Sequence, residues 1–179
     1  QSGHETFLEI LIGINSDRPG LLAGMSGVLA ANGINIIGSE INTPDGVVFD
    51  RFFGYLMTPA DDIELFQQNL QKDLTMAIEL EVPIENIFAK NGRVYRFDRV
   101  GGNVIIEPTQ VDFRRGQAEE GKEASVMTIK TSDRIGLLYV IARVLSERYG
   151  INILKVSVKT YQNGALDEFV LAKIHPDGK

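Results

Sequence analysis

The sequence predicts an α+β protein built from two copies of one small strand–helix–strand–strand unit. Two repeated segments carry this prediction. Ser16–Leu22 recurs with a single difference as Ser132–Leu138, an offset of 116 residues, and Gly33–Ile36 recurs as Gly150–Ile153, an offset of 117. The second copy has therefore gained one residue between the two segments. A period of this length is too long for a solenoid repeat and indicates a tandem duplication of a small domain.

Each copy is expected to begin with an apolar strand, at residues 7–14 and 126–130, followed by a loop and an amphipathic helix. The apolar residues of both helices fall at i, i+1, i+4, i+7 and i+8, which is the spacing of one helix face. They are Leu21, Leu22, Met25, Val28 and Leu29 in the first copy, and Leu137, Leu138, Ile141, Val144 and Leu145 in the second. Gly33 and Gly150 lie where these helices should end and can form a left-handed C-cap.

Two further strands are expected in each copy, joined at the turn dipeptides 45–46 and 163–164. Asp50 and Asp167 occupy matched positions in the second of these strands. A structural hydrogen bond is the favoured role for both aspartates, and a ligand contact is the alternative.

A second helix is expected only in the first copy. Thr58 is expected to cap it, with Pro59 at its first position and an apolar stripe from Ile63 to Ala77. The second copy stops at residues 175–179, where its own helix would begin, so we expect it to lack that helix.

Three segments are predicted from this pattern. The first module spans residues 5–90, and the incomplete second module spans residues 124–179. Residues 91–123 belong to neither repeat and are expected to form a linker with a possible hairpin and strand, within segments 94–97, 104–106 and 111–113.

Composition excludes several classes of function. With 18 basic and 24 acidic residues the chain carries a net charge of −6, which argues against a nucleic-acid partner. Residues 90–115 interleave arginines with aromatics, and a solvated hairpin is favoured there over docking onto an acidic protein surface.

No apolar run reaches the roughly 18 residues that a membrane helix needs. The absence of cysteine is compatible with the cytoplasm, where we place the protein.

The sequence offers no catalytic constellation. The two histidines, His4 and His175, lack metal-ligand spacing, and there is no cysteine to act as a nucleophile or thiolate ligand. No pair of carboxylates is recognisable as an acid and a base. We therefore expect no metal, no cofactor and no enzymatic activity in this chain.

The repeated loop is the candidate ligand site. A glycine at the start of a helix leaves backbone N–H groups accessible, and these groups attract a carboxylate. An asparagine at the start of the next strand offers both a donor and an acceptor. The candidate residues are Asp17, Arg18, Pro19, Gly20, Leu21 and Asn35 in the first copy, and Asp133, Arg134, Ile135, Gly136, Leu137 and Asn152 in the second. The structural alternative is that the aspartates cap helices and the asparagines finish a turn.

Both copies resemble the ACT domain family. The resemblance rests on the segments 17–22, 33–36 and 50–52 and on their counterparts 133–138, 150–153 and 167–169, within residues 7–80 and 124–174. It implies ferredoxin-like βαββαβ modules that bind amino acids across domain interfaces and regulate attached enzymes. Residues 108–113 resemble the linker strand between the paired ACT domains that end the bacterial PII uridylyltransferase/uridylyl-removing enzymes. That similarity implies glutamine as the first ligand to test.

Three functions follow from these observations. The first is an amino-acid-sensing pair of ACT modules that controls an attached or partner enzyme of nitrogen or amino-acid metabolism. The second is a stand-alone ACT adaptor or transcription-regulatory protein that acts through protein contacts. The third, which the duplication does not favour, is a small ferredoxin-like enzyme such as an acylphosphatase. In each case a bare sheet face is expected to drive self-association through sheets or helices.

Overall fold

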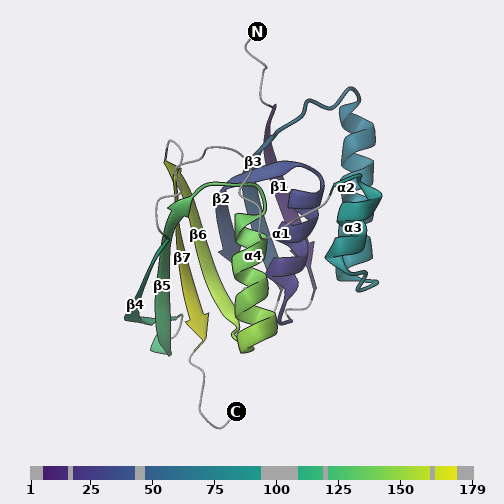
Figure 1. Ribbon diagram of the computed structural model, residues 1–179. Coiled ribbons are helices and arrows are strands. Elements are labelled where there is room, and N and C mark those ends of the chain that lie inside the picture. The colour runs from purple at the N-terminus through teal and green to yellow at the C-terminus, as the bar shows by residue number, and fades with distance from the viewer. Residues whose placement is uncertain are drawn as a thin grey trace.

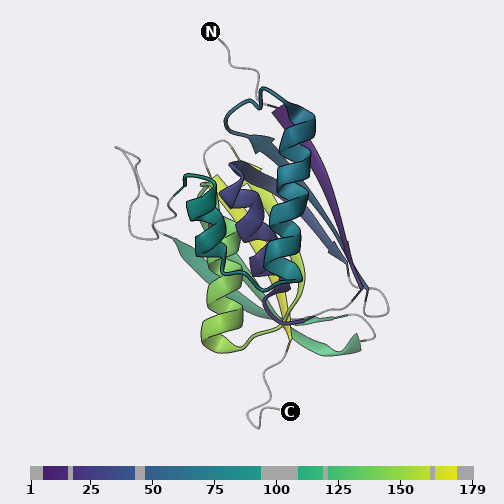
Figure 2. The same cartoon turned by 90° about the vertical axis from the view of Figure 1, so that its right-hand side faces the viewer.

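The computed structural model describes residues 6–15, 18–42, 47–93, 109–118, 121–161 and 164–172. Their strands form one seven-stranded antiparallel sheet with the helices on one face (Figures 1 and 2). The elements of the first half are β1 (Thr6–Ile14), α1 (Leu21–Ala31), β2 (Ile34–Asn42), β3 (Val48–Leu56), α2 (Ile63–Ile78) and α3 (Ile84–Lys90). Those of the second half are β4 (Gln110–Gln117), β5 (Glu123–Ser132), α4 (Leu137–Arg143), the π-helical turn η3 (Val144–Arg148), β6 (Ile153–Tyr161) and β7 (Gly164–Ala172).

The sheet has the order β1-β3-β2-β6-β7-β5-β4, so each half contributes one continuous part. The order β1, α1, β2, β3 in the first half is repeated by β5, α4, β6, β7 in the second, which confirms the predicted pair of ferredoxin-like modules. The modules join where β2 pairs with β6, with Ser39 opposite Val158 at the centre of the contact. The two halves therefore form a single sheet.

Helices α1 and α4 pack against each other above this junction (Figure 1). The apolar face of α1 is almost wholly buried, with Val28 and Leu29 fully inaccessible to solvent. Gly27 lets the helices approach, because a Cβ at this position would lie 3.0 Å from the Tyr139 ring of α4 and 2.9 Å from the Ile84 side chain. The core is thus shared between the modules.

The extra residue of the second copy is accommodated by η3. Helix α4 continues into this π-helical turn, whereas α1 stays α-helical to its end. A π-helical turn holds one more residue than the corresponding α-helical turn, so the insertion is absorbed between the two repeated segments. Both helices then reach the expected glycines, Gly33 (φ 76°) and Gly150 (φ 62°).

Helix α2 forms as predicted, but its expected cap was wrong. Asp62, and not Thr58, caps the helix, because its Oδ1 accepts a hydrogen bond of 2.9 Å from the Leu65 N–H. The side chain of Asp73 then ties α2 to its neighbours. Its buried carboxylate accepts hydrogen bonds from Asn32 at the end of α1, and from Lys90 and Asn91 at the end of α3.

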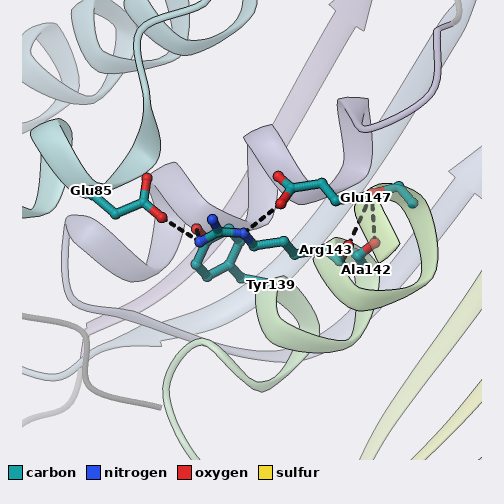
Figure 3. A network of polar contacts seen from close by, with 6 residues as sticks. Glu85, Tyr139, Ala142, Arg143 and Glu147 are labelled. Carbon is teal, nitrogen blue, oxygen red and sulfur yellow. Dashed lines mark hydrogen bonds and ion pairs between the residues drawn. The ribbon is translucent and has the colours of Figure 1, made fainter. Parts of the chain in front are cut away.

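The short helix α3 was not predicted, since residues 84–90 have no counterpart in the second copy. It bridges the modules through Arg143 of α4 (Figure 3). The Arg143 guanidinium forms an ion pair with Glu85 of α3, and it also bonds Glu147 (2.8 Å) and the Tyr139 hydroxyl (2.8 Å). The ion pair between Arg143 and Glu85 therefore connects the two modules on the helical side of the sheet.

Strand β4 lies beside β5 and extends the sheet of the second module, not that of the first. Val111 and Phe113 pair with Ile129 and Met127, which belong to the core, so they face the helical side. Phe113 is nevertheless 68% exposed. Among the described residues no helix covers this part of the sheet.

Several predicted features lie outside the described residues. They are the turn at 45–46, the first residue of the turn at 163–164, the strands at 94–97 and 104–106, and the segment 175–179. The module boundaries remain predictions.

A substitution at Gly27 tests whether close approach of α1 and α4 holds the modules together. Gly27→Val should lower the free energy of unfolding by roughly 1–3 kcal/mol, because its side chain overlaps Tyr139 and Ile84. The matched control is Gly24→Ala in the same helix, where an added Cβ meets nothing within 4 Å. Urea denaturation should show the control equal to or more stable than the unaltered chain. Equal stability of both variants would contradict the packing described.

Candidate functional site

The two repeated loops have the same backbone geometry. Gly20 (φ 85°) and Gly136 (φ 78°) both adopt the left-handed conformation immediately before a helix. The N–H groups of Leu21 and Leu137 donate to the carbonyls of Arg18 and Arg134, closing the same turn in each module. Left-handed backbone of this kind favours glycine over residues with a side chain. The glycines of the candidate site are thus required by the turn.

No described side chain caps α1 or α4 at the N-terminus. Asp133, for which helix capping was the structural alternative, instead accepts a 2.9 Å hydrogen bond from the Asn35 side chain. Asn35 opens β2 of the first module, and Asp133 precedes α4 of the second. The loop of one module therefore meets the strand start of the other.

In the first pocket the modules change roles, because the loop of the first module meets the strand start of the second. It is lined by Arg18, Gly20 and Leu21 from the first module and by Asn152 and Ile153 from the second. Asp50 of β3 also lines it and is 2% exposed. The volume of the cavity is about 30 Å³, enough for a few water molecules and too small for an amino acid.

The second pocket lies at the equivalent place in the other module. Its polar lining consists of Asp133, Arg134 and Asp167, and its apolar lining includes Ile36 of β2. The volume is only about 10 Å³. In both pockets a ligand of amino-acid size could enter only if the loop moved.

Asp167 is the unusual group of the second pocket. It is 1% exposed, and its Oδ1 atom has no hydrogen-bond partner within the described part of the chain. Burial, together with the nearby charge of Asp133, raises the pKa of Asp167 from 3.8 to about 7. The Lys159 backbone N–H opposes this shift by bonding the carboxylate. The Asn35 Oδ1 atom is also buried, and no residue in the described ranges bonds it.

Arg18 distinguishes the first loop from the second. Its guanidinium donates to Glu81 (2.8 Å) and to the Ile78 carbonyl, at the end of α2. A cavity of about 180 Å³ lies beside this contact and is lined by Pro19, Gly20 and the end of α2. The second module has no described helix at this position, so the two loops are not equivalent.

The structure brings most of the predicted site residues together. Arg18, Gly20, Leu21 and Asn152 share the first pocket, whereas Asp133, Arg134, Gly136 and Leu137 share the second and Asn35 is bonded to Asp133. Pro19 lines only the cavity beside α2, and Ile135 packs against the core. Asp17 lies outside the described residues.

Two features of the pockets were not predicted from the sequence. Sequence order places each asparagine in the same copy as the loop before it, whereas the structure places each against the other copy's loop. Asp50 and Asp167 line the pockets, although a structural hydrogen bond was the favoured role for both. Their matched positions in the repeat were the signal that could have included them.

Comparison with known proteins agrees with this geometry. Residues 9–74 match the model of the ACT domain family. The chain contains an ACT domain. This match covers the loop, α1, β2 and β3 of the first module, and the second module repeats the same order of elements.

The chain is also similar to bifunctional uridylyltransferase/uridylyl-removing enzymes. It is 32% identical to that of Burkholderia lata and 31% identical to that of Burkholderia orbicola, over 92% of its own length. It spans 18% of the length of these relatives. Among the described residues, no helix combines the length and apolar character needed to cross a membrane.

The raised pKa of Asp167 predicts how stability depends on pH. An acid that binds its proton more tightly when folded stabilises the fold fully below its unfolded pKa, near 3.8, and this stability is lost as the pH rises through about 7. Asp167→Asn should therefore gain stability over the unaltered chain between pH 4 and pH 8, by on the order of a few kcal/mol. Thermal denaturation of both proteins across this range measures the difference. A difference that does not change with pH would show that Asp167 is ionised throughout.

Proposed function

We propose that this chain is a regulatory, amino-acid-sensing pair of ACT modules that controls an attached or partner enzyme of nitrogen metabolism. The observation that carries the proposal is the exchange between modules, in which each loop meets the strand start of the other module. A ligand bound there would contact both modules and change how they are held. The match to the ACT domain model, within a chain that spans only 18% of the similar bifunctional enzymes, supports a regulatory segment of such a protein.

The proposed ligand is a free α-amino acid, and glutamine is the first to test. Its carboxylate would face the N–H groups near Gly20 or Gly136, where the helix dipole favours an anion. Its ammonium would lie near Asn152 in the first pocket or near Asn35 in the second, because an amide oxygen can accept from it. The two sites need not have equal affinity.

The small volumes of the two pockets support a mechanism in which the loops move when a ligand binds. Cavities of about 30 and 10 Å³ must open to admit an amino acid, so binding would select a conformation with displaced loops. The first loop is tied to α2 through Arg18, and α2 is tied to α3 through Asp73. Movement of that loop would therefore reach the helices that bridge the modules.

Self-association and a cytoplasmic location stay predictions. The part of the second module's sheet that no described helix covers exposes Val111 and Phe113. Sedimentation velocity over a range of concentrations tests for a second copy on this face, and a monomer at all concentrations would contradict it.

A ligand series tests the proposed pose. Glutamine, its decarboxylated amine and N-acetylglutamine should be titrated calorimetrically into the intact chain. Loss of the carboxylate or masking of the ammonium should each weaken binding roughly 10- to 100-fold, since each removes a hydrogen bond to a charged group. Unchanged affinity for either derivative would show that the pose is wrong.

Two substitutions should separate binding from folding. Gly136→Val should weaken ligand binding at the second loop, because its branched side chain strains the left-handed backbone there. Leu138→Ala should cost roughly 2–5 kcal/mol of stability, because it truncates a buried side chain. Binding and unfolding measured on both variants should show opposite patterns. Equal loss of both properties in both variants would count against a site at the loop.

A further inference from the structure

The second pocket contains a buried carboxylate with one oxygen that no described residue bonds. Asp167 is 1% exposed and lines this pocket, and its Oδ1 atom lacks a hydrogen-bond partner among the described residues. Leaving a buried polar atom unpaired costs stability, and the cost is greater for a charged group. A hydrogen-bond donor is therefore missing at this position.

The surroundings define the kind of donor that fits. Asp133 lines the same pocket, and the Asn35 side chain that donates to it has a buried oxygen without a partner among the described residues. Two carboxylates against the single guanidinium of Arg134 make the charged lining anionic, which favours a cation with several N–H donors. The remaining lining is largely apolar, including Ile36, Val158 and Ala165, which suits the carbon skeleton of a small organic ligand.

We propose that Asp167 is the anionic partner of the ligand's protonated primary amine in the second pocket. This inference rests on the proposed function and assigns a residue that the repeated loop motif does not contain. An ammonium offers three donors, so it can satisfy Asp167 and still bond Asp133, the other carboxylate of the lining. A metal ion fits less well, because the described residues contain no group of three or more carboxylates or histidines that could hold one.

The first module provides a matched comparison. Asp50 occupies the same strand position, is equally buried and lines the first pocket, but, unlike Asp167, it is not among the described residues with a buried, unpaired side-chain oxygen. The proposal therefore assigns the ammonium contact to Asp167 alone. The two pockets should depend differently on the charge of their aspartates.

The raised pKa of Asp167 supplies a second readout. The charged groups that line the pocket beside it are Asp133 and Arg134, and the lining contributed by β2, β6 and α4 carries none. Because the pKa of Asp167 is about 7 in the folded chain, much of it is protonated below neutral pH. An ammonium ligand needs the ionised form, so its affinity should fall as the pH is lowered.

The experiment is a titration of the intact, ¹⁵N-labelled chain with the twenty common amino acids at pH 8, beginning with L-glutamine. The N–H signals of Gly20 and Gly136 report the two pockets separately. For an amino acid that moves the Gly136 signal, Asp167→Asn should weaken binding at that pocket roughly 10- to 100-fold, whereas Asp50→Asn should leave it unchanged. In the unaltered chain the same affinity should fall roughly tenfold between pH 8 and pH 6.

The possible outcomes are distinguishable. If an amino acid binds at the second pocket with the same affinity in Asp167→Asn, or with an affinity independent of pH, the assignment of Asp167 is wrong and the proposed function stands. If no amino acid moves the Gly136 signal but one moves the Gly20 signal, the second pocket is not a site and this inference fails alone. If none binds at all, the proposed function fails with it.

Discussion

Strands β2 and β6 meet along only three residue pairs, Gly38–Lys159, Ser39–Val158 and Glu40–Ser157, and this short contact makes two sheets into one. Without it α1 and α4 would not share a core, and Asn35 would not reach Asp133. Each pocket combines one module's loop with the other's strand start. The candidate site is therefore a property of the pair and is absent from either module alone.

The two modules have diverged in what surrounds this shared junction. The first has helix α2, which holds Arg18 at the edge of its loop, whereas the second has strand β4 and no described second helix. Both pockets contain a buried aspartate, but only Asp167 of the second has a buried oxygen that is unpaired among the described residues. The two copies thus kept the same loop geometry, whereas the pairing of the buried aspartates in their pockets came to differ.

The repeat predicted the elements of both modules, because a helix face and a turn glycine leave local patterns that survive duplication. The glycine caps followed from the same alignment, and so did the presence of one extra residue between Leu138 and Gly150, which the structure places in η3. Features set by contacts between distant segments could not be predicted. Helix α3 has no repeat partner, the position of β4 depends on β5, and the meeting of Asn35 with Asp133 depends on how the sheets join. The cap of α2 was predicted at Thr58, but the helix begins four residues later, at Ile63, where Asp62 is the residue in position to cap it.

The central claim is that each pocket belongs to both modules. Side-chain and backbone N–H signals of the intact chain, followed during titration with a binding amino acid, test it directly. The Asn35 side-chain amide should shift together with Gly136, and the Asn152 side-chain amide together with Gly20, each pair following one binding curve. If Asn35 instead follows Gly20 and Asn152 follows Gly136, each site lies within one module and the account is wrong.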